Sequence, residues 1–159
     1  MVNSVLRFKH ILAVFTTAAS FFITGLSPAI AQSEGSSTLT VQVTGARNTK
    51  GRIGVLLFES AQGFPNDNSK AVRQQTVDIE PSTLSGQAVF KNLPHGTFAV
   101  AVLHDENGNG KMDKNLMGIP KEGYGASNNP PKKMRAPSFD EARFSLDSSE
   151  KTIEVKLIY

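Results

Sequence analysis

Oxygen-bearing side chains alternate along the segment DENGNGKMD, residues 105–113. In a hand-type calcium loop, side chains at positions 1, 3, 5 and 9 supply oxygens, the backbone carbonyl of position 7 supplies another, and a glycine at position 6 allows a sharp turn. Counting from Asp105, the glycine of position 6 is Gly110. The segment therefore predicts a cation site whose candidate ligands are the side chains of Asp105, Asn107, Asn109 and Asp113 and the carbonyl of Lys111.

The calcium shell is incomplete within this segment. Position 12, where a bidentate glutamate is expected, holds Leu116. Calcium takes about 6 to 8 oxygens, and Glu122 is a nearby carboxylate that could fold back to complete the shell. Because Lys111, Lys114 and Lys121 lie close in the chain, we expect the calcium affinity to be weak, as in extracellular modules.

The same residues also carry a strong turn signal. The pairs Asn107-Gly108 and Asn109-Gly110 both accept positive φ. A metal-free turn, however, does not by itself require alternating oxygens or predict Asp113, so a hard cation is the favoured interpretation. A transition-metal site on His95 and His104 is a further alternative, but two isolated histidines are more often ordinary turn and strand-end residues.

No catalytic motif accompanies the acidic loop. The sequence GASNN around Ser127 lacks the final glycine of a G-x-S-x-G elbow, SSEK at 148–151 lacks the partners of an S-x-x-K motif, and H-E-x-x-H is absent. The alternative function is a small secreted hydrolase that uses Asp105, Asp113 and Glu122. Metal-ligand spacing explains the same residues, so we expect a non-catalytic binding or structural module.

A polar and aromatic segment, GIPKEGYGASNN, follows the loop at residues 118–129. Tyr124, Ser127 and Asn128, with the adjacent Asn129, could form a rim that recognises a sugar or peptide, for example a cell-envelope glycan or protein. The plainer interpretation is that Tyr124 packs against the fold and that the glycines serve a folded-back backbone.

The N-terminus predicts export. Residues 1–31 combine basic Arg7 and Lys9, an apolar run too short to span a membrane, and an A-x-A pattern at 29–31, so we expect a signal peptide cleaved after Ala31. Its removal lowers the formal net charge from +3 to +1, which argues against nucleic-acid binding. The chain has no cysteine, which excludes a lipid anchor and disulfides. The expected destination is the periplasm or the medium.

Period-two patterns dominate the rest of the chain. A short flexible leader, residues 32–37, precedes a single expected domain at 38–159. Alternating or continuous apolar residues predict seven strands, at 38–45, 52–60, 75–81, 86–93, 97–105, 142–147 and 152–159. The strand at 97–105 has Phe98, Val100 and Val102 on one face and small alanines on the other, which suits coverage on both sides. We expect an all-β, antiparallel seven-stranded β-sandwich, immunoglobulin-like or transthyretin-like.

Two connections between the expected strands are longer than a turn. The first contains a possible helical turn starting near Asn68, with Phe64 folded over the core. The second, residues 104–138, contains the acidic loop and the polar segment. A structureless excursion of that length is unusual in a compact domain, so we expect this cross-connection to be ordered.

The stretch from residue 90 to residue 147 resembles the domain-of-unknown-function 2141 family of secreted bacterial proteins. Its hallmarks are an aspartate-asparagine-glycine loop and a G-I-P-x-E-G-[YF]-G-x-S-N segment, here residues 118–128 with Ala126 in place of a larger residue. The turn NLPHGTF also resembles that of transthyretin-like and carboxypeptidase-regulatory-like sandwich domains, with Phe98 replacing the usual tyrosine. The resemblance implies a fold and an exported location, and no activity.

Overall fold

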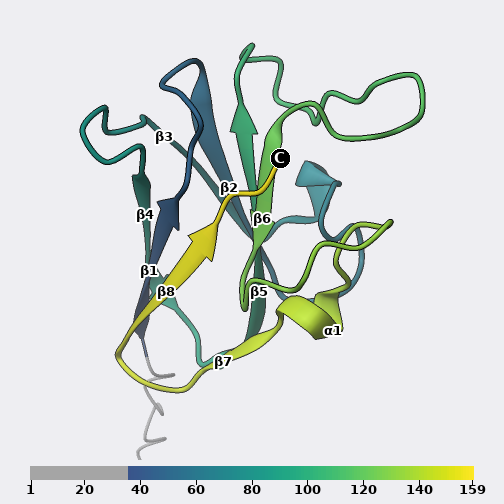
Figure 1. The fold of residues 1–159 in the computed structure, drawn as a ribbon. Helices are drawn as coiled ribbons and strands as arrows, with labels where there is room; N and C mark the ends of the chain where they lie inside the picture. The colour runs from purple at the N-terminus through teal and green to yellow at the C-terminus, as the bar shows by residue number, and fades with distance from the viewer. Residues whose placement is uncertain (1–35) are drawn as a thin grey trace, which may run out of the picture. The chain divides into compact units, whose positions relative to one another are not determined.

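The computed structural model describes residues 36–159, so the expected signal peptide and residues 32–35 of the expected leader lie outside the described residues, while Ser37, also expected in the leader, is the first residue of a strand. Strands dominate this part of the chain (Figure 1). They are β1 (Ser37–Thr44), β2 (Arg52–Phe58), β3 (Arg73–Val77), β4 (Gly86–Leu93), β5 (Gly96–Asp105), β6 (Gly123–Ala126), β7 (Phe144–Leu146) and β8 (Glu150–Lys156). Two short helices, η1 (Asn68–Lys70) and α1 (Phe139–Ala142), complete the elements.

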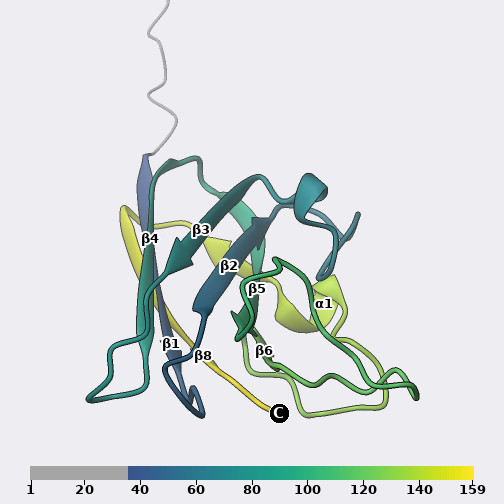
Figure 2. The ribbon, with the colours of Figure 1, turned by 90° about the horizontal axis from the view of Figure 1, so that it is seen from above.

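The strands form two sheets that face each other across a common core (Figures 1 and 2). One sheet has the order β4-β1-β8, and the other has the order β3-β2-β5-β6 with β7 paired to β5. Alternate side chains of the inner strands point inward, as their period-two patterns predict. The fully buried members include Leu39, Val41 and Val43 of β1, Ile53, Val55 and Leu57 of β2, Val100 of β5 and Val155 of β8.

The all-β, two-sheet prediction is confirmed, with two differences in detail. All seven expected strands are present within residues 36–159, but β6 is an eighth. It was missed because GYGA is short and glycine-rich and shows no apolar alternation. The fold is also not purely antiparallel, since β1 and β8 pair in parallel, with Val41 opposite Ile153. These strands come from opposite ends of the domain, so no tight hairpin imposes antiparallel pairing on them.

The outer face of the second sheet carries a smaller apolar cluster. Ala99 of β5, Ala126 of β6 and Ala142 of α1 are buried together there. Phe64 covers the cluster, with its ring 5.3 Å from that of Phe58 and 6.0 Å from that of Phe139, both edge-on. The prediction that β5 is covered on both sides is therefore confirmed, as are the helical turn at Asn68 and the folded-back Phe64.

The expected cross-connection is divided by β6. Its first part, residues 106–122, leaves the end of β5 and returns to it, and Figure 1 shows this part projecting beyond β6 and away from β4. The second part, residues 127–138, leads to α1. Within residues 36–159, no helix combines the length and apolar character that a membrane crossing needs.

Candidate functional site

Glu122 closes the acidic loop at its base. Pairing of β5 with β6 sets His104 opposite Gly123, which brings Glu122 next to the start of the loop. Its side chain is only 4% exposed. One carboxylate oxygen accepts the backbone N–H of Glu106 at 2.9 Å, and the other accepts that of Asp113 at 3.0 Å. Glu122 thus folds back onto the loop, but it does so through main-chain amides, which tie the two ends of the loop together, and not through the side chains of the other predicted ligands.

Asp105 organises the first turn of the loop. Its carboxylate accepts three backbone N–H groups, from Gly108 at 2.8 Å, Asn109 at 3.1 Å and Gly110 at 2.7 Å. The chain can curl around one side chain because Gly108 and Gly110 adopt φ of +75° and +73°, a region that other residues enter only with strain. The turn is therefore held together by this one carboxylate.

Asn107 and Asn109 connect that turn to Asp113. Their side-chain oxygens accept the N–H groups of Asn109 and Lys111, respectively, two residues further on. Their amide nitrogens donate to the carboxylate of Asp113 at 2.6 and 3.0 Å. The four predicted side-chain ligands thus lie in one connected network, and Lys111 joins it through its main-chain N–H.

The network shows that a metal-free turn can use all four of the predicted side chains. Contrary to expectation, hydrogen bonds alone engage Asp105, Asn107, Asn109 and Asp113. Within residues 36–159, no three side chains among His, Cys, Asp and Glu gather in a metal-binding group. A cation would therefore rely on the two asparagines, whose amides would have to turn their oxygens toward Asp113.

His104, at the end of β5, is fully buried beside the loop. Its Nε2 lies 2.8 Å from the carbonyl oxygen of Lys50, and its Nδ1 lies 2.6 Å from the hydroxyl of Tyr159. Because a carbonyl only accepts, Nε2 donates to Lys50, while Nδ1 shares a hydrogen bond with the hydroxyl of Tyr159. Both ring nitrogens are therefore used in holding the 45–51 loop, which connects β1 to β2, and the last residues of the chain to β5. His95 is exposed in the turn before β5.

Arg47 and Tyr159 support the loop from outside, and sequence reasoning missed both. The guanidinium of Arg47 lies 4.6 Å from the centre of the Tyr159 ring and pairs with Glu106 at 2.6 Å. Burial alone would raise the pKa of Glu106, but hydrogen bonds from Asn48 and Arg47 outweigh it and lower that pKa. No local pattern could have indicated this contact, since Arg47 and Tyr159 lie at opposite ends of the domain.

The predicted rim residues separate in the structure. Tyr124 is partly exposed and lines a pocket of about 240 Å³. Ser127 is fully buried, donates its hydroxyl to the carbonyl of Ala142 at 2.6 Å and accepts the N–H of Val100 at 2.9 Å, so it does not lie on an exposed rim. Asn128 is exposed but donates its side-chain amide to the carbonyl of Arg143 at 2.9 Å.

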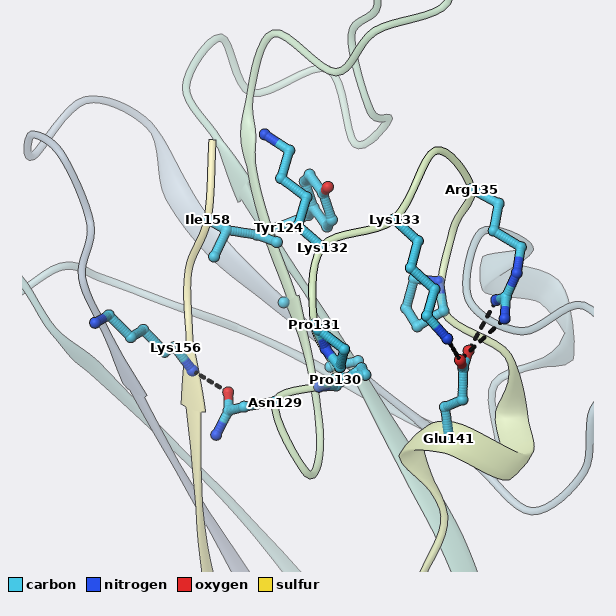
Figure 3. Close-up of a pocket in the computed structure, with 13 residues that line it drawn as sticks. Tyr124, Asn129, Pro130, Pro131, Lys132, Lys133, Arg135, Glu141, Lys156 and Ile158 are labelled. Carbon is cyan, nitrogen blue, oxygen red and sulfur yellow. Dashed lines mark hydrogen bonds and ion pairs between the residues drawn. The ribbon is translucent and has the colours of Figure 1, made fainter.

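Asn129 fastens the second part of the connection to β8 (Figure 3). Its side-chain oxygen accepts the N–H of Lys156 at 2.8 Å, and its side-chain nitrogen donates to the carbonyl of Glu154 at 3.0 Å. Asn128 and Asn129 adopt φ of +63° and +47°, and asparagine enters this region more readily than most residues. Consecutive asparagines are the signal by which the sequence could have revealed this turn.

Cations and prolines surround the pocket beside Tyr124 (Figure 3). Its wall includes Pro130, Pro131, Pro137 and Ile158, and its charged residues are Lys132, Lys133, Arg135, Glu141 and Lys156. Arg135 and Lys133 both pair with Glu141 and hold the pKa of its carboxyl well below the usual range. The basic cluster KKMR is thus partly neutralised by one internal carboxylate.

Comparison with known proteins places the chain in a family. Residues 41–154 match the family described as "Uncharacterized protein conserved in bacteria (DUF2141)". No curated protein and no solved structure matches the chain. The match includes both the acidic loop and the segment from Gly118 to Asn128, which confirms the family to which these motifs pointed. Because it extends over well more than half of the sequence, the chain belongs to the DUF2141 family.

Proposed function

We propose that the protein is an exported, non-catalytic binding or structural module whose acidic loop binds calcium and thereby orders a long surface connection. The observation that carries the proposal is that the side chains of Asp105, Asn107, Asn109 and Asp113 meet in one connected network. Carboxylate, amide and carbonyl oxygens are the ligands that calcium prefers. The loop therefore gathers two carboxylates and two side-chain amides within a single closed turn, and waters would complete the calcium shell.

A calcium ion would act on the orientation of the two amides. Asn107 and Asn109 direct N–H groups at Asp113, and a cation there would favour the opposite orientation, with oxygens inward. That change gives up the two hydrogen bonds that the amide oxygens accept from the backbone. This loss and the neighbouring lysines both lower the affinity, which is consistent with the weak sites of extracellular modules.

The environment of Glu122 supports a non-catalytic role. A hydrolytic acid or base must reach its substrate, whereas Glu122 is 4% exposed and both of its oxygens accept main-chain N–H groups. The hydrolase that would use Asp105, Asp113 and Glu122 is the competing proposal. Hydrolysis of a glycan or ester substrate that Glu122→Gln abolishes, with an unchanged circular dichroism spectrum, would favour the hydrolase.

Export is supported by the order of residues in the first 31 positions, basic, then apolar, then small. N-terminal sequencing of the protein recovered from periplasm or medium should begin at Gln32, and retention of Met1 would contradict the proposal. The finer architectural proposal is kinship with transthyretin-like sandwiches, and it rests on the NLPHGTF turn, which joins β4 to β5.

The calcium proposal is tested by thermal unfolding in calcium, in magnesium and in chelator. A ligand that binds only the folded state raises its stability. At about 5 mM calcium and a dissociation constant of about 0.5 mM, the stabilisation is about 1.4 kcal/mol, or roughly 5 °C in Tm. Asp113→Asn, which is nearly isosteric, should abolish the calcium shift, and Asp140→Asn at the exposed helix α1 should retain it. Equal Tm values in calcium and chelator would overturn the proposal.

The pocket beside Tyr124 favours a second candidate function, recognition of an acidic cell-envelope glycan or peptide. Its wall combines an aromatic ring, prolines and an excess of cations, and such surfaces suit anionic ligands with an apolar face. Acidic oligosaccharides would be screened by calorimetry, with Tyr124→Ala as the test variant. Equal binding by both proteins would remove Tyr124 from this candidate site.

A further inference from the structure

A compact apolar tip lies between the acidic loop and β6, at residues 115–119. Leu116 is fully exposed, Met117 is 79% exposed and Ile119 is 49% exposed. Single exposed apolar residues are common on protein surfaces, but three within four positions form a patch. None of them belongs to either core cluster, so the tip is available for contact outside the domain.

Hydrogen bonds hold the tip in one conformation. The side-chain oxygen of Asn115 accepts the N–H groups of Met117 and Ile119, each at 2.9 Å. The N–H of Asn115 donates to the carbonyl of Ile119, and that of Gly118 donates to the carbonyl of Asn115, again at 2.9 Å. Gly118 adopts φ of +77°, which closes the turn. The apolar side chains are thus presented by an ordered backbone, so little conformational entropy is lost when they are buried.

Basic residues surround the tip. Lys114 and Lys121 flank it, and the backbone of Lys114 bridges to Pro120 across its base. Lys111 lies just before them in the acidic loop. All three lysines are exposed, and within the part of the chain that the structure describes none forms an ion pair. The nearest carboxylates, Asp113 and Glu122, are directed into the loop network. The three lysines therefore form a basic collar of exposed side chains around the tip, whereas the carboxylates of residues 105–122 are held in the loop network or, at Glu106, by Arg47.

An apolar tip with a basic collar fits an anionic lipid surface better than a protein partner. A stable protein interface uses roughly 800 Å² on each side and about 20 to 30 residues, far more than this turn offers. A bilayer requires only that a few apolar side chains enter the acyl boundary while cations remain at the headgroups. From this geometry we infer that residues 114–121 dock the protein onto anionic membranes by inserting Leu116, Met117 and Ile119. The inference is independent of calcium binding and goes beyond the proposed function.

The test is flotation of the purified protein with vesicles of phosphatidylglycerol and phosphatidylcholine, and with vesicles of phosphatidylcholine alone, in chelator. Burying a leucine or methionine side chain changes partitioning by at least about tenfold. Leu116→Ser with Met117→Ser should therefore weaken binding to anionic vesicles by roughly 100-fold. Met134→Ser is the matched control, because Met134 is equally exposed beside basic residues but lies in the 127–138 segment. It should bind as the wild type does.

A spectroscopic readout checks insertion directly. The chain has no tryptophan, so Leu116→Trp introduces a single reporter at the tip and Met134→Trp a matched one elsewhere. Anionic vesicles should shift the emission of the first reporter to the blue and leave the second unchanged. No binding by the wild type, equal binding by the double variant, or equal blue shifts at both positions would overturn the inference. So would self-association that the double variant abolishes in the absence of vesicle binding, since this would assign the tip to a protein contact.

Discussion

Two regions of the chain that adjoin the end of β5 are ordered by different physical means. In the first part, residues 105–121, polar side chains bind nearby main-chain groups, and the network lies mostly among exposed residues. In the second part, residues 122–130, which includes β6, the chain is ordered by pairing with β5 and by close approach to β8. Local hydrogen bonds make the first part self-supporting, whereas the second depends on the sheets. A polar sequence can therefore be either an independent loop or an integral part of the fold.

Glycine has opposite uses in the two parts. Gly108 adopts φ of +75° and has nothing within 4 Å of the place where a Cβ would stand. At Gly125 of β6, a Cβ would lie 2.7 Å from Cγ1 of Val155 and 2.9 Å from the carbonyl oxygen of Lys156. Gly108 is required for its left-handed backbone conformation, whereas Gly125 is required because the space between β6 and β8 has no room for a Cβ.

The largest loss of stability is expected when a side chain fills the space between β6 and β8. Gly125→Ala should lower the free energy of unfolding by about 3 kcal/mol, because the methyl group meets a main-chain oxygen that cannot move alone. Gly108→Ala should lower it by only about 1 kcal/mol, the strain of a left-handed conformation. Urea unfolding of both variants measures the difference, and equal losses would contradict the contrast between the two parts.

A smaller but still global loss is expected at Ser127. Ser127→Ala leaves the N–H of Val100 and the carbonyl of Ala142 without the partner that joins them, and buried unpaired groups of this kind cost about 2 kcal/mol. Ser145→Ala, at an exposed position of β7, is the matched control and should stay within about 0.5 kcal/mol. Should Ser127→Ala unfold at the same urea concentration as the control, its hydroxyl would have no structural role.

The contrast between the two parts also explains which structural features could be predicted from the sequence. Local signals identified the residues that gather in the acidic loop but not how they interact: Asp105, Asp113 and Glu122 were predicted as metal ligands, and the structure joins them by hydrogen bonds that span at most 16 residues. Local signals failed for β6 and for Ser127. A four-residue strand with two glycines has no periodicity of its own, and it becomes a strand only because β5 offers it an edge.

Local sequence patterns also did not predict the contacts between distant segments of the chain. The parallel pairing of β1 with β8 and the stacking of Arg47 on Tyr159 join segments from opposite ends of the domain. Alternation predicts that each strand has an apolar face, but it does not say which strand lies beside it. Seven of the eight strands and the two-sheet core were therefore predictable, whereas β6 and the sheet order were not. The turn at Asn128 and Asn129 has a local signal, its consecutive asparagines, but the contacts of these side chains with distant strands do not.

Disrupting the hydrogen-bond network around Asp105 should affect the loop and leave the rest of the fold unchanged. Asp105→Ala removes the acceptor of three main-chain N–H groups, but water can replace it at these exposed positions. In chelator, the variant should lose no more than about 1 kcal/mol of global stability. Amide hydrogen exchange at Gly108 and Gly110 should accelerate at least about tenfold, while exchange in β5 stays unchanged. A loss as large as that of Ser127→Ala would show that the loop is coupled to the core.

The smallest expected effect concerns Glu141, whose ion pairs with Arg135 and Lys133 hold part of the 127–138 segment against α1. These contacts lower the pKa of Glu141 in the folded protein. A lowered folded pKa stabilises the fold above the ordinary glutamate pKa, and this contribution is lost as the pH falls through the folded value. The Tm difference between wild type and Glu141→Gln should therefore be largest near neutral pH and shrink progressively below about pH 4.5.

Arg135→Met removes the largest cause of the shift in the pKa of Glu141, so in that background the pH dependence of the Tm difference should be weaker. A difference that is constant from pH 7 to pH 2 would mean that the pairs are too solvated to couple this segment to the fold.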